Sequence, residues 1–226
     1  FQRNKSMIHQ RELGGDTESF SQALRTALRQ APQVIMVGEM RDTESVEIAL
    51  EAAETGHLIL STLHTIDAAK TIERIIGVFP KEQEDFIRTR FSQTFRYIVS
   101  QRLLPKIDGK GRAIAIEVLK ANDRTRSYII KGEQSGNTLE AAMEDGEIDG
   151  MQTFDSQLLR LFQAKIINKE VALQYATNPN NLQLKLGIFG DNKREERKSG
   201  SAMIEDATLD GMPIIAIDQF SCSHLT

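Results

Sequence analysis

The sequence contains a single cysteine, Cys222, among its 226 residues. One cysteine can close no internal disulfide and cannot build a four-cysteine zinc site. An excess of positive charge is also missing, because 28 Lys and Arg residues stand against 32 Asp and Glu residues, giving a formal charge of −4. A non-specific nucleic-acid binder needs a basic surface that releases counterions. We therefore expect a protein of a reducing compartment without a nucleic-acid partner.

Long hydrophobic runs are absent as well. The longest apolar stretches, such as 34–37 and 58–60, are far shorter than the roughly 18 residues that predict a membrane span. No charged and apolar leader opens the sequence. We therefore expect no direct membrane insertion. Hydrophobic residues nevertheless make up 40% of the chain, which is enough to build a sizeable core.

Helical and extended patterns alternate over the first hundred residues, which predicts an α/β fold with a parallel sheet and helices on both sides. Asp16 or Thr17 is expected to cap the first helix, and Asp42 the second, which ends at a left-handed Gly56. The apolar spacing predicts helices over 20–31, 43–55, 66–76 and 81–99, and strands over 34–37, buried on both faces, and 57–61.

The second half of the chain changes character after a hairpin. Apolar runs at 99–104 and 113–119 flank a Gly-rich turn and predict an antiparallel hairpin at the sheet edge. Short helical patterns without strands follow at 123–131, 137–144, 154–165 and 169–176, and an Asn-Pro-Asn-Asn stretch at 178–181 ends them. A charge run at 193–198 is typical of a solvated linker. We divide the chain into an α/β part (1–121), a helical subdomain (122–186) and a loosely held, disordered tail (187–226) that includes the apolar stretch 212–220.

Two polar residues follow strands of the predicted sheet, where parallel sheets bind their ligands. Glu39 follows the strand 34–37 through Gly38, and His64 comes shortly after the strand 57–61. A carboxylate there can hold Mg²⁺ or its water, and an imidazole can contact a terminal phosphate, so the pair is compatible with nucleotide hydrolysis. The structural alternative is that Glu39 pairs with Arg41 or Arg11 and that His64 is a loop histidine bonded to backbone.

Other motifs give weaker support for chemistry. The turn at 108–111 contains Gly-Lys, but Leu104 stands where a phosphate-binding loop needs glycine, so the sequence contains no Walker A loop. His57 and His64 are separated by a strand, a spacing that disfavours a zinc site. Cys222 has no histidine anchored nearby, and catalytic thiol chemistry is therefore not expected.

Several ordered motifs resemble the PilT-like type IV pilus retraction ATPases, members of the secretion and pilus motor ATPases, over 1–186. They are Gln-Arg-Glu at 10–12, Val-Gly-Glu-Met-Arg-Asp at 37–42, and Glu-Thr-Gly-His-Leu at 54–58 through Thr-Leu-His-Thr at 62–65. The resemblance implies an incomplete RecA-like P-loop ATPase core. It matches the family's Walker B segment to Gly38-Glu39 and its His box to the stretch ending at His64. Glu39 is thereby implied to coordinate magnesium through water, His64 to sense the γ-phosphate of ATP, and Gly38 to adjoin the nucleotide.

The resemblance also implies an assembly. It implies a homo-hexamer with Thr55, Arg41 and Arg126 at subunit interfaces, an inner-membrane pilus platform protein as partner, and a location at the cytoplasmic face of the inner membrane. The family's N-terminal domain, Walker A loop and Asp box would precede residue 1. The chain is therefore expected to be the C-terminal part of a motor that hydrolyses ATP for pilus retraction and twitching motility, and to be inactive by itself.

Two alternatives to the retraction motor stay open. The family's helical motif Ala-Ile-Arg-Asn-Leu-Ile-Arg-Glu corresponds to 124–131 here, where Arg126 and Ile129 match outright, so a PilU-like accessory subunit is one alternative. A non-hydrolysing interaction module of a motor ring is the other. Pilus-assembly and type II secretion ATPases commonly carry a four-cysteine zinc subdomain, so the cysteine count favours the retraction branch over these relatives.

Overall fold

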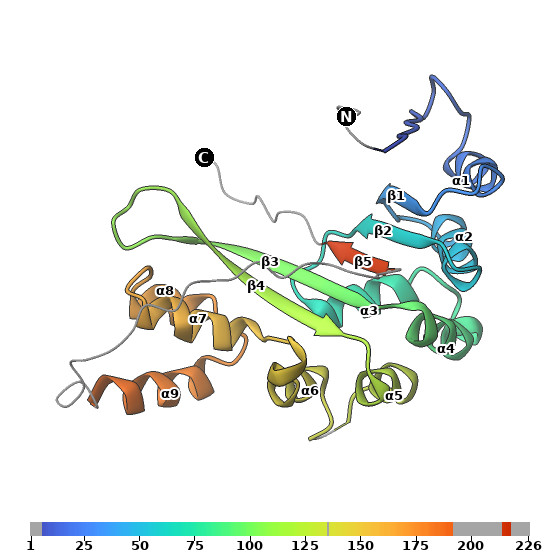
Figure 1. Cartoon of the computed structure of the whole chain (residues 1–226). Helices are drawn as coiled ribbons and strands as arrows, with labels where there is room; N and C mark the ends of the chain where they lie inside the picture. Colours follow the sequence, from blue (N-terminus) through green and yellow to red (C-terminus); the bar gives the residue numbers. More distant parts are fainter. Residues whose placement is uncertain (1–5, 135, 192–213, 218–226) are drawn as a thin grey trace.

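A computed structural model describes residues 6–134, 136–191 and 214–217 (Figure 1). The first part alternates helices and strands: α1 (Phe20–Leu28), β1 (Val34–Glu39), α2 (Thr43–Glu54), β2 (Leu58–Thr62), α3 (Ala68–Ile76), the 3₁₀ helix η1 (Lys81–Gln83) and α4 (Glu84–Thr94). The remainder comprises β3 (Tyr97–Pro105), β4 (Arg112–Lys120), α5 (Asp123–Lys131), α6 (Leu139–Asp145), the 3₁₀ helix η2 (Glu147–Asp149), α7 (Phe154–Gln163), α8 (Lys169–Gln174), α9 (Pro179–Asp191) and β5 (Ile214–Ile217).

The five strands form one sheet in the order β1-β2-β5-β3-β4 (Figure 1). The pairs β1 with β2, β2 with β5, and β5 with β3 are parallel, whereas β3 and β4 form an antiparallel hairpin at the sheet edge. The predicted α/β fold and edge hairpin are therefore confirmed. The parallel register sets Glu39 opposite Thr62, so β1 and β2 end side by side.

One face of β1 is open, which corrects the prediction of a strand buried on both faces. Ile35 and Val37 are buried, but Val34 and Met36 are 49% and 60% exposed. This alternation is what a strand with a single packed face shows. A short run of aliphatic residues does not reveal by itself whether one face or both are covered.

Helix ends follow local capping chemistry. Asp42 caps α2 as predicted, since its carboxylate accepts the Ser45 N–H at 2.8 Å, and Gly56 has the expected positive φ of +94°. The cap of α1 is Ser19, whose hydroxyl accepts the Gln22 N–H at 3.2 Å, and the predicted caps Asp16 and Thr17 are wrong. They lie too far before the first helical residue, Phe20, to reach its free N–H groups.

The helix predicted over 81–99 is wrong over its last five residues. The α4 helix ends at Thr94, and β3 begins at Tyr97. Phe95 and Ile98 do point into the core, as their helical spacing suggested, but they do so from an extended backbone. Every residue of β3 pairs with β4, and that ladder replaces the last helical turns.

A helix beginning at Pro179 was also missed, because the Asn-Pro-Asn-Asn stretch starts α9 and does not end the helical part. The Asn178 side chain accepts the Asn181 N–H at 3.1 Å, and proline follows at the first helical position, where its missing N–H costs no hydrogen bond. Within the predicted tail, α9 continues to Asp191 and residues Ile214–Ile217 form β5. The expected linker at 193–201 and the rest of 212–220 lie outside the described residues.

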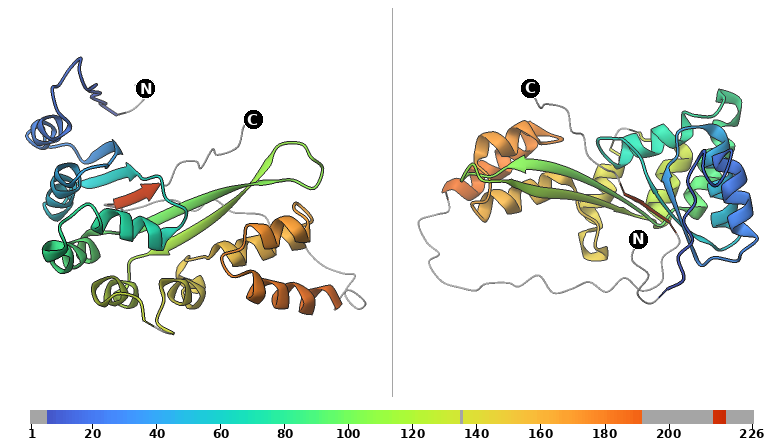
Figure 2. Two further views of the ribbon diagram at one scale, coloured as in Figure 1. Left: turned by 180° about the vertical axis from the view of Figure 1, so that it is seen from behind. Right: turned by 90° about the horizontal axis from the view of Figure 1, so that it is seen from above.

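Two hydrophobic clusters share the β3–β4 hairpin. Its near half contributes Ile98 and Leu119 to the cluster around the parallel strands, and its far half contributes Leu104 and Ala113 to a second cluster with α7–α9. Both views in Figure 2 show the green hairpin reaching from the sheet to the orange helices. The boundary after residue 121 stays a prediction, and the first cluster crosses it to include Ile129 of α5.

The buried carboxylate of Asp155 ties α7 to the start of α9. Its two oxygens accept the N–H groups of Thr177 at 2.7 Å and Asn178 at 2.9 Å. Asp155 is 5% exposed, so these bonds satisfy a carboxylate that burial would otherwise penalise.

We expect Asp155→Ala to lower the free energy of unfolding by roughly 2 kcal/mol, because it leaves two backbone donors unpaired. Asp155→Asn, which keeps an acceptor at the same place, should lose less. Urea denaturation of the two variants and the wild type measures this difference. Equal stability of all three proteins would mean that these hydrogen bonds do not contribute.

Candidate functional site

The sheet register brings the two predicted site residues together. Glu39 ends β1 opposite Thr62, the last residue of β2, and His64 follows Thr62 by two residues. The His64 Nε2 atom consequently lies 3.5 Å from Glu39 Oε2. Residues that are 25 positions apart thus face each other at the carboxyl edge of the sheet, where open parallel sheets bind ligands.

Glu39 also pairs with Arg41, whose Nη2 atom lies 2.5 Å from the same carboxylate oxygen. The hydrogen bond from Arg41 lowers the pKa of Glu39; burial opposes this effect, and the nearby charges of Arg41, His64 and Arg74 lower the pKa further. The Glu39 side chain is 20% exposed, against 72% for Arg41 and 60% for His64. Glu39 therefore does pair with Arg41, as the structural alternative predicts. This ion pair keeps the Glu39 carboxylate ionised at the end of the strand.

Open space adjoins this strand end at Gly38. The register of β1 and β2 shifts between Val37 and Glu39, which leaves Gly38 as a bulge, and the Thr62 hydroxyl donates to the Gly38 carbonyl. A Cβ atom built on Gly38 would meet nothing within 4 Å. The glycine thus leaves room for another molecule to approach the backbone.

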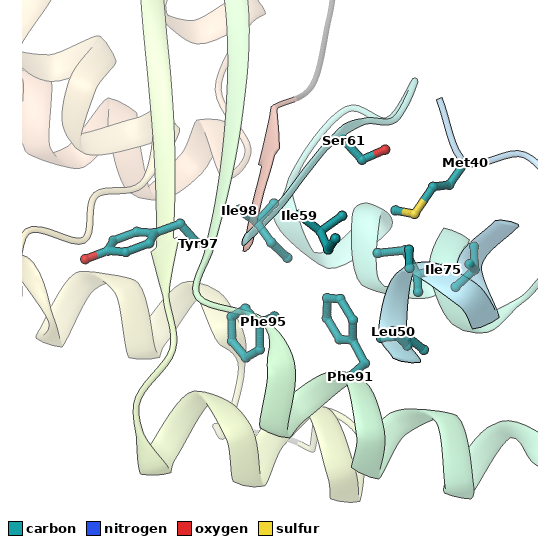
Figure 3. Close-up of a pocket in the computed structure, with 11 residues that line it drawn as sticks. Met40, Leu50, Ile59, Ser61, Ile75, Phe91, Phe95, Tyr97 and Ile98 are labelled. Carbon is teal, nitrogen blue, oxygen red and sulfur yellow. The ribbon is translucent and has the colours of Figure 1, made fainter. Parts of the chain in front are cut away.

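Two cavities differ sharply in what they can hold. The enclosed one lies in the core among β2, α2, α4 and β3 and has a volume of about 20 Å³ (Figure 3). It has room for about one water molecule, and the Ser61 hydroxyl that lines it has no hydrogen-bond partner among the described residues. The other is an open hollow of about 410 Å³ beside His64, lined also by Lys70, Glu73 and Arg74. Of these two, the hollow beside His64 is the one large enough for a phosphate-bearing ligand.

The residues present fit a magnesium ion that is held mainly by other ligands. Within the described ranges, no group of three Asp, Glu, His or Cys side chains is arranged to hold a metal. Mg²⁺ keeps several waters and commonly uses one or two carboxylates together with substrate phosphates. One ionised carboxylate with open space at the strand end suits that mode of binding.

The structure places two of the three predicted interface residues away from this site. Thr55 is exposed at the opposite edge of the sheet, where its hydroxyl bonds to His57 Nδ1 at 3.1 Å. Arg126 of α5 donates to the carbonyls of Ser92 at 2.8 Å and Gln93 at 3.0 Å, near the end of α4. A cation there complements the negative end of a helix.

A buried carboxylate next to the loop that carries His64 was missed at the sequence level. Glu117 of β4 is 4% exposed and accepts the Ala68 N–H, at the start of α3, at 2.7 Å. Burial raises the pKa of Glu117 to about 7, with the hydrogen bond from Ala68 and the charge of Arg102 acting in the opposite direction. A signal did exist, because Glu117 occupies an inward position of the alternating strand 113–119, otherwise held by Ala113, Ala115 and Leu119.

Solved structures of secretion ATPases share this fold. The crystal structure of the pilus retraction motor PilT with bound ADP aligns with a TM-score of 0.69 and 43% identity, covering 81% of this chain and 51% of that one. The Legionella pneumophila ATPase DotB aligns with a TM-score of 0.59 and 30% identity, covering 78% and 44%. The fold is therefore that of the RecA-like secretion ATPases, as the motifs predicted.

The chain belongs to the Type II/IV secretion system protein family, which matches residues 4–211. It is 43% identical to a twitching motility protein of Neisseria gonorrhoeae over 181 residues, which are 80% of this chain and 48% of that protein. It is also 43% identical to the type IV pilus retraction ATPase PilT of Pseudomonas aeruginosa over 177 residues, 78% and 51% of the two chains. The resemblance to PilT-like ATPases is confirmed, and the chain spans about half the length of these relatives.

We expect Glu117→Gln to remove a pH-dependent loss of stability. Because the native pKa is raised from 4.5 to about 7, the native state holds a proton in this window that the unfolded chain has released. The free energy of unfolding of the wild type should therefore fall, by roughly 3 kcal/mol relative to Glu117→Gln, as pH rises from 4.5 to above 7.

Urea denaturation of both proteins at several pH values between 4.5 and 8.5 measures this divergence. Glu170→Gln, at an exposed position of α8, is the matched control and should follow the wild-type profile. A constant offset between wild type and Glu117→Gln at every pH would show that Glu117 does not titrate in this window.

Proposed function

We propose that the chain is the C-terminal part of a hexameric motor that hydrolyses ATP to drive type IV pilus retraction and twitching motility. The observation that carries the proposal is the pairing of Glu39 and His64 at neighbouring strand ends, 3.5 Å apart, beside an open hollow. This is the place where a parallel sheet presents groups to a nucleotide. The 43% identity to PilT and the likeness to its ADP-bound structure support this assignment.

The two residues would act on different parts of the nucleotide. Glu39, kept ionised by Arg41, would hold a water of Mg²⁺, whose charge offsets that of the phosphates. His64 lies on a loop and is more exposed than Glu39, so it would reach out to the γ-phosphate. A contact that exists with ATP and is lost with ADP biases a two-state element toward one arrangement.

The proposed assembly follows the relatives named as pilus motors. Subunits would meet as a homo-hexamer through the exposed Thr55 and Arg41 and through the region of Arg126. The ring would act on an inner-membrane pilus platform protein from the cytoplasmic face of that membrane. Across the described parts of the chain, no helix is long and apolar enough to cross a bilayer.

A PilU-like accessory subunit is the second candidate, because identity alone does not separate the two. The type IV pilus ATPase PilU of Pseudomonas aeruginosa is also 43% identical, over 192 residues that cover 84% of this chain and 50% of PilU. A non-hydrolysing interaction module of a motor ring is the other alternative. Steady-state ATPase activity of the full-length motor distinguishes hydrolysis from such a module.

In that full-length motor we expect Glu39→Gln to keep nucleotide binding and to lower turnover roughly 100-fold or more, because it removes the charge that organises the metal while preserving shape. Steady-state ATPase rates and nucleotide titrations measure the two effects. Arg41→Gln is the matched control, since it breaks the same ion pair and leaves the carboxylate in place. Equal, small effects of both variants would reduce Glu39 to a surface ion-pair partner.

We expect His64→Ala to weaken a non-hydrolysable ATP analogue by roughly 1.5–3 kcal/mol, the range for one hydrogen bond to a charged group, and to leave ADP affinity nearly unchanged. Calorimetric titration of both ligands against mutant and parent measures the difference. His57→Ala, at the other end of β2, should alter neither affinity. Equal losses for both ligands, or none for either, would show that His64 does not sense the γ-phosphate.

A further inference from the structure

The guanidinium of Arg102, on β3, joins the loop that carries His64 to the C-terminal helices. Its Nη2 atom donates to the Ile66 carbonyl at 3.3 Å, two residues after His64. Its Nη1 atom donates to the Tyr175 carbonyl at 2.7 Å, at the end of α8. One guanidinium therefore binds backbone carbonyls from two segments that are more than one hundred residues apart in sequence.

The remaining contacts fix the plane of this guanidinium. Its central carbon lies 3.8 Å from the centre of the Phe154 ring, at the start of α7. Nη1 also reaches the Thr177 hydroxyl at 3.5 Å. A flat, delocalised cation that is stacked on an aromatic ring cannot rotate freely. It therefore cannot follow the movement of one carbonyl and still keep its hydrogen bond to the other. A displacement of either carbonyl must therefore move the other or break a hydrogen bond.

A second residue of the β3–β4 hairpin, Glu117, also holds the backbone that follows His64. Glu117 faces Ser100 across the β3–β4 ladder, which places it diagonal to Arg102 on one face of the hairpin. Its carboxylate accepts the Ala68 N–H, whereas Arg102 donates to the Ile66 carbonyl. The loop between β2 and α3, residues 63–67, is thus tied to the hairpin through Ile66 and through Ala68, the first residue of α3. Its first half, with His64, faces Glu39.

Three acidic groups act on the Arg102 cation through their charge. Burial lowers the pKa of Arg102, and the charges of Glu117, Asp67 and Asp155 act in the opposite direction by favouring its ionised form. Asp155 in turn accepts the N–H groups of Thr177 and Asn178. The segment 175–178 is therefore held both by Arg102 and by Asp155.

We propose that Arg102 is a positioning residue that couples the loop 63–67 to the α7–α9 helices, so that the arrangement of these helices sets where His64 stands. The proposal rests on the proposed function insofar as His64 is taken to contact phosphate. A neighbouring subunit or partner protein that contacts the α7–α9 helices would thereby change nucleotide binding. Bound nucleotide would in turn change how these helices are arranged.

The test is a double-mutant cycle on the 226-residue chain, read at His64 without nucleotide. Asp155→Asn removes one of the two acceptors for Thr177 and Asn178 and so shifts the segment 175–178. We expect this change to move the ring ¹⁵N resonances of His64 in the wild-type background. In an Arg102→Lys background, which keeps the charge and loses the planar fork, the same change should leave these resonances in place.

Arg112→Lys is the matched control, because Arg112 is exposed at the far end of the hairpin, and in that background the effect of Asp155→Asn should persist. If the ¹H–¹⁵N spectrum shows that Arg102→Lys does not fold, Arg102→Gln replaces it in the same test. The coupling would be overturned if Asp155→Asn moved the His64 resonances equally in the wild-type and Arg102→Lys backgrounds. It would also be overturned if Asp155→Asn did not move them in the wild-type background. Because the readout needs no nucleotide, failure of the ATPase assays would overturn the proposed function and leave this result standing.

Discussion

The parallel register between β1 and β2 is the constraint on which the candidate site depends. It is set by the core, since Ile35, Val37 and Ile59 are all buried on the packed face. A slip by one residue would turn these side chains toward the open face, at a cost of several buried aliphatic groups. The same register sets Glu39 opposite Thr62 and thereby brings His64 within reach. Core packing therefore fixes the register that brings Glu39 and His64 to neighbouring strand ends.

The two halves of the site differ in how firmly they are held. Glu39 belongs to a strand and is ordered by the sheet, whereas His64 belongs to a loop whose far side is bound by Arg102 and Glu117. A group on a strand can hold a fixed position, and a group on a tethered loop can respond to what its tether does. The arrangement pairs one stationary group with one adjustable group across 3.5 Å.

Features with a local cause could be predicted from the sequence. The helix 123–131 was placed at its observed bounds, because Asn122 caps one end and Gly132, with φ of +74°, terminates the other. Glu39 and His64 follow recognisable strands. Contacts between distant segments could not be predicted from local sequence patterns. The hydrogen bond from Ala68 to Glu117 spans 49 residues, and that from Arg102 to Tyr175 spans 73. The end of α4 was missed because strand pairing with β4, a non-local interaction, overrides helical spacing.

The long hairpin that both hydrophobic clusters share has a mechanical consequence. All nine residues of β3 pair with β4, and the two ends of the hairpin are anchored in different cores. Each strand runs from one cluster to the other, so a pull along the strand direction between the sheet and the α7–α9 helices is carried by both covalent backbones side by side. A pull across the strands would instead open them one pair at a time. The hairpin therefore resists stretching along its length far more strongly than it resists separation of its two strands.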